Sequence, residues 1–284
     1  MTIAQALRDA SARLHGVSQS GELDASRLME SVIDHDRSAL IARGDAELEA
    51  AQTERFAALV ARRERGEPIA YVLGSVGFFG RTFLVDERVL VPRPESEHLI
   101  EAALDDLRGR KKTDGSIADV GCGSGALGIT LACELPELSV YALDISIDAL
   151  SVTRRNAALN RVFQRVTIVR GDLLAPLERF GERVDCVIAN LPYIPTAAVP
   201  QKPDPVGFEP VLALDGGPDG LDLYRRLLTQ LPRVCAPNCA IFLEAAPDTI
   251  EPLAALCVRA YPVAHIEVGE DYARSERYVA MFTK

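Results

Sequence analysis

Beyond about residue 95, short apolar runs rich in β-branched residues alternate with segments whose apolar residues recur at helical spacing. This alternation predicts an α/β fold, in which helices pack on an open sheet of parallel strands. The expected strands are 117–121, 139–144, 165–170, 184–190, 239–244, 263–268 and 277–283, and the expected helices are about 125–135, 147–160, 220–233 and 248–260. Ligands of such a sheet bind at the carboxyl ends of the strands, so the residues that follow each strand are candidate site residues.

Two regions of different pattern precede the alternating part. Residues 1–67 predict helices, which span 4–14, 24–33 and 48–65. Asp24 is the predicted N-cap of the second of these helices. Residues 68–94 mix glycines with aromatic residues and predict a β-hairpin. We therefore expect an N-terminal helical domain over 1–67, a β-hairpin linker over 68–94 and the α/β domain over 95–284.

Charge and cysteine content narrow the classes of protein. The chain has 41 acidic and 31 basic residues and a net charge of −10, which argues against a protein that holds bare nucleic acid by its phosphates and suits a basic protein partner. The six cysteines form no CxxC pair, so we expect free thiols in a reducing cytoplasm and no metal site. We also expect a cytoplasmic location because neither a membrane span nor a signal peptide is evident.

The first predicted strand runs into a glycine-rich turn, Asp119-Val120-Gly121-Cys122-Gly123-Ser124-Gly125-Ala126-Leu127. Glycines allow a ligand to approach the backbone closely, because no Cβ intervenes. The spacing is G-x-G-x-G, whereas dinucleotide sites use G-x-G-x-x-G to seat a pyrophosphate at a helix start. A tight structural turn is the alternative interpretation of these glycines taken alone.

Carboxylates follow the next two predicted strands. Asp144 ends one strand, where it can accept both hydroxyl protons of a ribose, and Asp172 follows the other, where it can accept from an exocyclic amine. A nucleoside that is recognised at ribose and base and lacks a pyrophosphate points to S-adenosylmethionine. The candidate cofactor-binding residues are Asp119, Gly121, Cys122, Gly123, Ser124, Gly125, Asp144, Ile145, Asp172, Leu173 and Asn190.

The strand 184–190 ends in the tetrapeptide Asn190-Leu191-Pro192-Tyr193. The asparagine carboxamide both accepts and donates hydrogen bonds, and the tyrosine offers a flat face for stacking. Pro192 also restrains Leu191 towards an extended conformation. Together these residues could clamp a planar amino or amide group. An ordinary X-Pro turn accounts equally well for the four residues taken alone.

Taken together with other segments, these motifs resemble the HemK-type protein-glutamine N5-methyltransferases, the family that modifies the Gly-Gly-Gln glutamine of peptide-chain release factors. The resemblance covers nearly the whole chain. Besides the glycine turn and the tetrapeptide, it is carried by Leu23-Asp24-Ala25, Glu67-Pro68-Ile69-Ala70-Tyr71-Val72-Leu73-Gly74, Val89-Leu90-Val91-Pro92-Arg93-Pro94-Glu95-Ser96-Glu97, Phe208-Glu209-Pro210 and Ala213-Leu214-Asp215-Gly216-Gly217-Pro218-Asp219-Gly220-Leu221.

The resemblance implies a Rossmann-like class I S-adenosylmethionine-dependent methyltransferase sheet, joined to a small N-terminal helical domain by a β-hairpin linker. It implies methyl transfer to a glutamine amide nitrogen, with S-adenosylhomocysteine as the second product. We expect the Asn190 side-chain carbonyl and the Leu191 backbone carbonyl to accept hydrogen bonds from the substrate NH₂, with no general base. The acceptor-side residues are then Asn190, Leu191, Pro192, Tyr193, Leu90 and Arg93.

Two positions depart from the pattern of this family. The family usually has Asn-Pro-Pro-Tyr, and Leu191 here replaces the first proline. Leucine retains the backbone carbonyl but loses the fixed φ. Because Pro192 still restrains Leu191 from the other side, we expect activity to survive. Ser96 stands where threonine is usual and keeps the hydroxyl.

Other functions remain open at the level of sequence. A nucleic-acid amino-methyltransferase also acts on a planar NH₂ group, after base flipping, and the glutamine of a ribosomal protein is a possible acceptor within the same family. A non-catalytic scaffold that keeps the fold is a third alternative. The expected partner is a release factor bound by a monomer, with no stable binding to nucleic acid or membrane.

Overall fold

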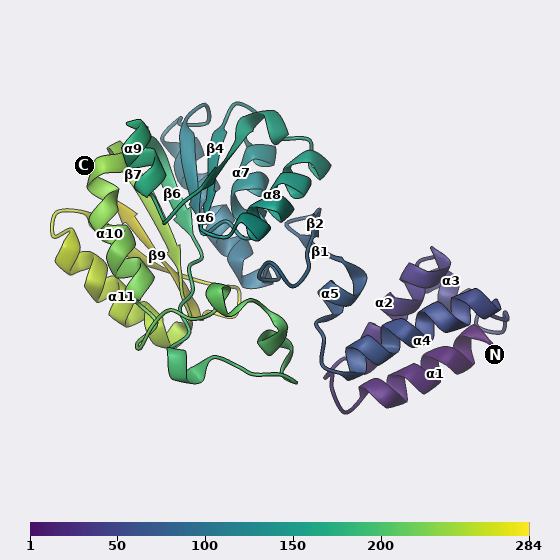
Figure 1. Cartoon of the computed structure of the whole chain (residues 1–284). Helices are drawn as coiled ribbons and strands as arrows, with labels where there is room; N and C mark the ends of the chain where they lie inside the picture. Colours follow the sequence, from purple (N-terminus) through teal and green to yellow (C-terminus); the bar gives the residue numbers. More distant parts are fainter. Residues whose placement is uncertain (284) are drawn as a thin grey trace. The chain divides into compact units, whose positions relative to one another are not determined.

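The computed structural model describes residues 1–283 of the chain (Figure 1). The chain divides into two compact units. The first comprises Met1–Gly74 together with Pro200–Phe208, and the second comprises Ser75–Val199 together with Glu209–Lys284. The segment 200–208 therefore belongs to the helical unit, although it lies inside the α/β part of the sequence.

The first unit is built from helices whose apolar faces meet in one core. These helices are α1 (Ile3–Leu14), α2 (Gly21–Ile33), α3 (Arg37–Ala42), α4 (Ala50–Glu64) and α5 (Ile69–Leu73). Leu14, Leu28 and Met29 are fully buried in this core, and Phe56 and Val60 of α4 pack with them. The sequence predicted the three longer helices. It missed α3 and α5, which are too short for helical spacing to be recognised.

The sequence predicted that Asp24 is the N-cap of α2, and this prediction was wrong. Ser20 occupies that position, and Asp24 lies inside the helix. Asp24 is only 4% exposed, and its carboxylate accepts a hydrogen bond from Nε of Arg63 at 2.8 Å. An ionised side chain is buried at tolerable cost only when it is paired in this way. The prediction was wrong because the sequence does not reveal that α4 supplies the partner.

Within residues 1–283, the second unit contains a seven-stranded sheet in the order β5-β4-β3-β6-β7-β9-β8. The strands from β3 to β7 pair in parallel, which confirms the predicted open α/β sheet. The strands are β3 (Ser116–Val120), β4 (Ser139–Asp144), β5 (Val166–Arg170), β6 (Val184–Ala189), β7 (Cys235–Glu244), β8 (His265–Glu270) and β9 (Glu276–Phe282). A separate antiparallel hairpin is formed by β1 (Ser75–Phe78) and β2 (Arg81–Leu84).

The last two strands differ from the parallel arrangement that we expected for every strand. β9 lies between β7 and β8 and is antiparallel to both. Only residues 271–275 connect β8 to β9. Two parallel neighbours need a crossover of a dozen or more residues, so this short turn allows only the antiparallel pairing.

Helices cover both faces of the sheet (Figure 1). α6, α7 and α8 pack on one face, and α9, α10 and α11 pack on the other. Their bounds are α6 (Glu97–Gly109), α7 (Ala126–Glu134), α8 (Ile147–Leu159), α9 (Ala175–Phe180), α10 (Asp222–Val234) and α11 (Pro247–Ala260). Short 3₁₀ turns are η1 (Pro94–Ser96), η2 (Phe163–Arg165), η3 (Thr196–Ala198), η4 (Pro205–Phe208) and η5 (Val211–Ala213).

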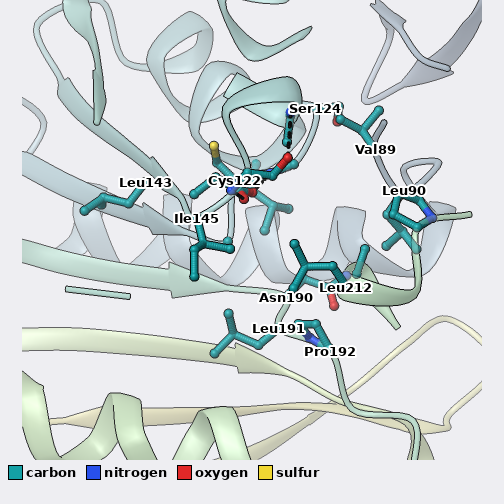
Figure 2. Close-up of a pocket in the computed structure, with 18 of the residues that line it drawn as sticks. Val89, Leu90, Cys122, Ser124, Leu143, Ile145, Asn190, Leu191, Pro192 and Leu212 are labelled. Atoms are coloured by element: carbon teal, nitrogen blue, oxygen red, sulfur yellow. Dashed lines mark hydrogen bonds between the residues drawn. The ribbon is translucent and has the colours of Figure 1, made fainter. Parts of the chain in front are cut away.

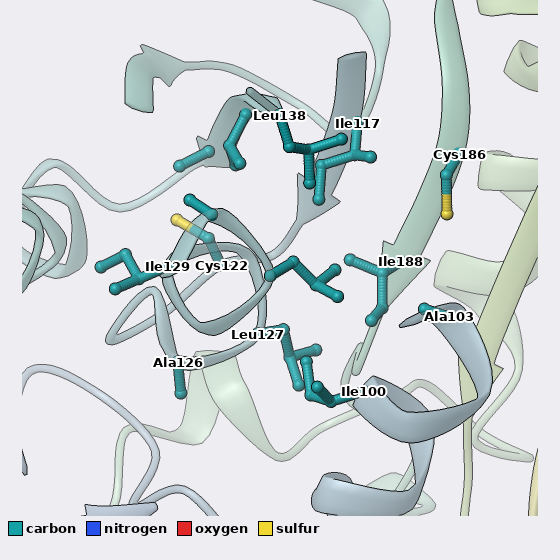
Figure 3. Close-up of a cluster of buried hydrophobic side chains, with 14 of the residues drawn as sticks. Ile100, Ala103, Ile117, Cys122, Ala126, Leu127, Ile129, Leu138, Cys186 and Ile188 are labelled. Atoms are coloured by element: carbon teal, nitrogen blue, oxygen red, sulfur yellow. The ribbon is translucent and has the colours of Figure 1, made fainter. Parts of the chain in front are cut away.

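Alternate strand residues supply the two hydrophobic cores on either side of the sheet. Ile117 and Ile188 face the core beneath α6 and α7, as Figure 3 shows. Their neighbours Ala118 and Val187 face the opposite core. Because side chains alternate along a strand, a sheet covered on both faces requires continuous apolar strands, which is the pattern read from the sequence.

Successive strands are added on one side of β3 up to β5 and on its other side from β6 onwards. β3 is followed on one side by β4 and β5, and on the other side by β6 and β7. Val120 pairs with Ala189, the last residues of β3 and β6. The glycine turn and the Asn190 tetrapeptide therefore begin side by side at a topological switch point, where ligands of open α/β sheets bind.

Candidate cofactor and substrate site

A pocket opens at the carboxyl ends of β3, β4, β5 and β6 (Figure 2). The candidate residues in its wall come from all four strand ends, and Leu90 joins them from the linker. These residues are Gly121, Cys122, Gly123, Ser124, Asp144, Ile145, Asp172, Leu173, Asn190, Leu191, Pro192 and Leu90. The candidates that the structure leaves out of this wall are Asp119, Gly125, Tyr193 and Arg93.

The backbone of the glycine turn lies in hydrogen-bonding contact with the end of β4. The backbone N–H groups of Gly121 and Cys122 both donate to the Leu143 carbonyl, at 2.8 and 2.9 Å. Gly121 has a φ of +70°, and a Cβ there would lie 2.8 Å from Cδ2 of Leu191. The left-handed backbone favours glycine at this position, and any larger residue would also displace the Leu191 side chain. The turn thus brings bare backbone to the pocket wall.

Asp144 connects the end of β4 to the glycine turn. Its Oδ2 accepts from the Gly123 N–H at 2.9 Å, and its Oδ1 accepts from the Ser146 N–H at 2.8 Å. Burial raises the pKa of this carboxyl, while these backbone hydrogen bonds oppose the rise. A carboxylate offers about four acceptor positions, so roughly two remain available for hydroxyl groups of a ligand.

Asp119 lies beneath the pocket and not in its wall. It is 1% exposed, and its Oδ2 accepts from the Gly128 N–H of α7 at 2.9 Å. Burial raises the pKa of Asp119 to about 7, and its Oδ1 has no hydrogen-bond partner among the described residues. The side chain therefore holds the start of α7 against β3, and any effect on a ligand is indirect.

Asp172 faces the pocket but is already paired. Its carboxylate forms an ion pair with Arg226 of α10, which also lines the pocket. Leu173 beside it is buried and has a φ of +51°. Sequence reasoning missed Arg226, because a single arginine on an amphipathic helix carries no sign that it faces a strand end.

The Asn190 tetrapeptide divides between the pocket and the protein interior. Asn190 lines the pocket, and its Nδ2 donates to the Ser96 hydroxyl at 3.3 Å. Leu191 is 2% exposed, and its carbonyl accepts from the Tyr224 hydroxyl at 3.2 Å. Tyr193 lies outside the wall, and burial raises its pKa to about 12.

Arg93 takes part in a contact that the sequence did not predict. Its Nη2 donates to both carboxylate oxygens of Glu209, at 2.7 and 2.8 Å. The Glu209 side chain is 1% exposed. This buried carboxylate fastens the linker to the segment after residue 208, whose Pro210, Leu212 and Ala213 reach the pocket wall.

Two protein-family models match this chain, each over a different range of residues. The PrmC N-terminal domain matches residues 5–74, and the methyltransferase small domain matches residues 98–201. The chain is 40% identical to the release factor glutamine methyltransferase of Moorella thermoacetica over 98% of its own length and 97% of that protein. The chain belongs to the release factor glutamine methyltransferase family. The corresponding protein of Bacillus anthracis is 37% identical over 87% of this chain and 88% of that protein.

Solved structures show the same fold at much lower identity. The hMettl16 catalytic domain in complex with an RNA hairpin has a TM-score of 0.56 and 16% identity, over 92% of this chain and 91% of that chain. A methyltransferase from Pyrococcus furiosus has a TM-score of 0.52 and 17% identity, over 78% of this chain and 96% of that chain. These neighbours identify the sheet of this release factor glutamine methyltransferase family member as a Rossmann-like class I methyltransferase sheet.

The wall of the pocket fits the cofactor that methyltransferases of this class use, S-adenosylmethionine. Gly121 and Gly123 present backbone without a Cβ, and Asp144 keeps acceptor positions for a ribose diol. Within residues 1–283, no three His, Cys, Asp or Glu side chains are grouped as metal ligands. None of the helices in that range is long and apolar enough to span a membrane.

Proposed function

We propose that this chain transfers a methyl group from S-adenosylmethionine to the side-chain amide nitrogen of the glutamine in the Gly-Gly-Gln motif of peptide-chain release factors. The observation that carries this proposal is its 40% identity, over 98% of the chain, to a release factor glutamine methyltransferase. The position of Asn190 in the wall of the same pocket as the glycine turn supports it from the structure.

The cofactor side of the reaction is assigned to the ends of β3, β4 and β5. Asp144 would accept from the ribose hydroxyls, and Asp172 would accept from the adenine amine once it is released from, or shared with, Arg226. S-adenosylmethionine supplies an activated methyl group, so the protein has mainly to position the acceptor. Asp119 would support this part of the site through α7, because it accepts from Gly128.

The acceptor side is assigned to Asn190 and Leu191. A glutamine amide nitrogen is a poor nucleophile because its lone pair is delocalised into the carbonyl. Two carbonyl acceptors that hold both N–H groups would aim the nitrogen and stabilise positive charge that develops on it. The Asn190 Nδ2 is already directed to Ser96, which supports Oδ1 as the acceptor. The Leu191 carbonyl has two lone pairs, so it can serve the substrate beside Tyr224.

Pro192, Leu90, Tyr193 and Arg93 complete the proposed acceptor side. Pro192 and Leu90 are apolar members of the pocket wall. Tyr193 lies outside this wall, so we assign it to support of the tetrapeptide and not to stacking on the substrate amide, and Arg93 would hold the linker in place through Glu209. We place the reaction in the cytoplasm, where release factors act, and we propose that the enzyme works as a monomer.

Transfer of tritium from labelled S-adenosylmethionine tests this function. The acceptors to compare are a purified release factor, its Gly-Gly-Ala variant, a ribosomal protein and RNA. We expect label in the release factor and none in the variant that lacks the glutamine. Label that appears only in RNA or only in the ribosomal protein would overturn the proposed substrate.

Asn190→Ala tests the proposed clamp directly. Loss of one preorganised acceptor should lower kcat by about a hundredfold or more, with little change in cofactor affinity. Asn160→Ala is the matched control, because the Asn160 amide likewise donates through Nδ2, here to the carbonyls of Thr82 and Asn156, but lies outside the pocket wall. Parental turnover by Asn190→Ala would disprove the mechanism.

A further inference from the structure

Glu244 is a buried carboxylate beside the acceptor site that the proposed mechanism does not use. It ends β7 and is 4% exposed. Its Oε2 is buried and has no hydrogen-bond partner among the described residues. An unpaired oxygen of this kind is expensive to bury, and such groups persist mainly where they serve a function.

The neighbours of this carboxylate come from other segments of the same unit. The Ser96 hydroxyl and the Asn190 amide lie within hydrogen-bonding reach of the Glu244 side chain, and both favour its charged form. Ser96 also accepts from Nδ2 of Asn190 at 3.3 Å. Tyr224 donates to the backbone carbonyls of both Glu244 and Leu191, which ties the end of β7 to the tetrapeptide.

These contacts determine which way the Asn190 amide is turned. An amide group carries its donor and its acceptor on opposite sides. An ionised carboxylate at position 244 offers only acceptors, and the Ser96 hydroxyl, once it donates its proton to that carboxylate, can only accept from Asn190. Together they select the arrangement in which Nδ2 faces them. Oδ1 then faces away from them. Asn190 lines the pocket, so the free oxygen is available to a ligand there.

We propose that Glu244 is a positioning residue, whose ionised carboxylate holds the Nδ2 side of Asn190 and thereby presents Oδ1 to the amide nitrogen of the substrate. This inference rests on the function proposed above. Glu244 does not itself line the pocket. It acts through Asn190 and takes no part in binding the cofactor.

The charge state of Glu244 decides whether one orientation of the Asn190 amide is favoured over the flipped one. A protonated carboxyl can donate to Oδ1 of Asn190 and so stabilise the flipped amide, which would present a donor to the substrate NH₂. Burial is the largest influence and raises the pKa of Glu244 to about 7. Glu95 raises this pKa further, Arg277, Ser96 and Asn190 lower it, and the hydroxyls of Tyr193 and Tyr224 also face the group. The amide selection should therefore fail as the pH falls through about 7.

Glu244→Gln tests the proposal, because it keeps the size of the side chain and removes its charge. A glutamine can accept from Nδ2 or donate to Oδ1, so the preference for one amide orientation is lost. With release factor as acceptor we expect kcat at pH 8 to fall by about tenfold or more, while the KM for S-adenosylmethionine stays within about twofold. Glu270→Gln, at the exposed end of β8, is the matched control and should keep parental kcat.

The pH profile provides a readout that a purely structural role would not change. Parental kcat should fall between pH 8 and pH 6, and in Glu244→Gln this decline should disappear. Glu95→Gln should move the decline to lower pH, because it removes a like charge that raises the pKa of Glu244. A decline that persists unchanged in Glu244→Gln belongs to another group, such as Asp119, and overturns the inference.

Thermal unfolding at pH 8 separates positioning from structural support. The ionised form of Glu244 is disfavoured in the folded state, so Glu244→Gln should raise the midpoint temperature while it lowers kcat. A variant with lower stability and lower kcat would indicate that Glu244 merely supports the fold. If parental enzyme labels RNA in place of the release factor, the proposed function fails first, and the same comparison is then made on RNA to judge Glu244 separately.

Discussion

Replacement of Leu191 separates the stability of the site from its chemistry. Leu191 stands where this family usually has proline, and its side chain is 2% exposed. It packs in the core with Val120 and Ala189, against Gly121 of the glycine turn. Its backbone carbonyl, in contrast, is the group that we assign to catalysis. Leu191→Ala removes the packing and keeps the carbonyl.

The expected loss of stability follows from this burial. Truncation removes roughly three methylene equivalents at ~0.8 kcal/mol each, or about 2.5 kcal/mol of transfer free energy. A sealed void would add to this and bring the cost towards ~5 kcal/mol. Leu191 borders the pocket, so water can enter the vacated space and the additional cost is small. We expect the free energy of unfolding to fall by about 2.5–3 kcal/mol.

Urea unfolding and steady-state kinetics together measure the two effects. Unfolding is followed by circular dichroism, because the chain contains no tryptophan. Methyl transfer to release factor is measured where each variant is fully folded, and kcat for Leu191→Ala should stay within about threefold of parental, since the carbonyl acceptor is retained. Leu191→Pro, which restores the usual family residue, should also keep kcat within about threefold.

Two results would refute this reasoning. A folded Leu191→Ala variant with a hundredfold lower kcat would mean that the side chain itself, or the position that it enforces, is part of catalysis. A Leu191→Pro variant that is many times faster than the parental enzyme would mean that a rigid φ matters more than the carbonyl.

Other predictions address the helical unit, the cofactor pocket and pH. Arg63→Met should lower the unfolding free energy of the helical unit by about 3–5 kcal/mol, because Asp24 is left buried and unpaired, and the double variant Asp24→Leu/Arg63→Met should recover most of it in urea unfolding. Asp144→Ala should weaken S-adenosylmethionine binding by at least about a hundredfold in isothermal titration, since two charge-assisted hydrogen bonds to the ribose contribute ~1.5–3 kcal/mol each. Because the variant also loses the acceptors of the Gly123 and Ser146 N–H groups, a 2′,3′-dideoxy analogue measures that structural loss alone and should distinguish the parental and variant proteins far less. Burial raises the pKa of Asp119 to about 7, so its contribution to stability is complete below about pH 4 and is lost as the pH rises through 7. Asp119→Asn should remove this slope and stabilise the cofactor-free protein at pH 8 by up to about 4 kcal/mol, as thermal unfolding across that range would show. An unchanged slope in Asp119→Asn would contradict that assignment.

Local patterns were sufficient to predict most of the α/β elements. The run at 184–189 is a strand in which every residue except Asp185 is buried in one core or the other, and a nearly continuous apolar run is what such a strand requires. The glycine turn could also be predicted, since a left-handed φ at Gly121 and a ligand-accessible backbone both favour glycine. Charged residues that pair with a partner far away in the sequence, in contrast, produce no local pattern from which the pairing could be predicted.

Local sequence patterns predicted an α/β sheet and the strand ends that carry polar residues, and the motifs together predicted the family. The sheet and its polar strand ends follow from periodicity and spacing, which are properties of neighbouring residues, whereas the family follows from the resemblance of several motifs in the same order. The folded structure was needed to show that Asp24 pairs with Arg63, that Arg93 binds Glu209, that β9 runs antiparallel, and that Glu244 contacts Ser96 and Asn190. The effect of a buried charge on stability depends on its partner. Which residue becomes the partner depends on how distant elements pack, and local sequence patterns do not encode this packing.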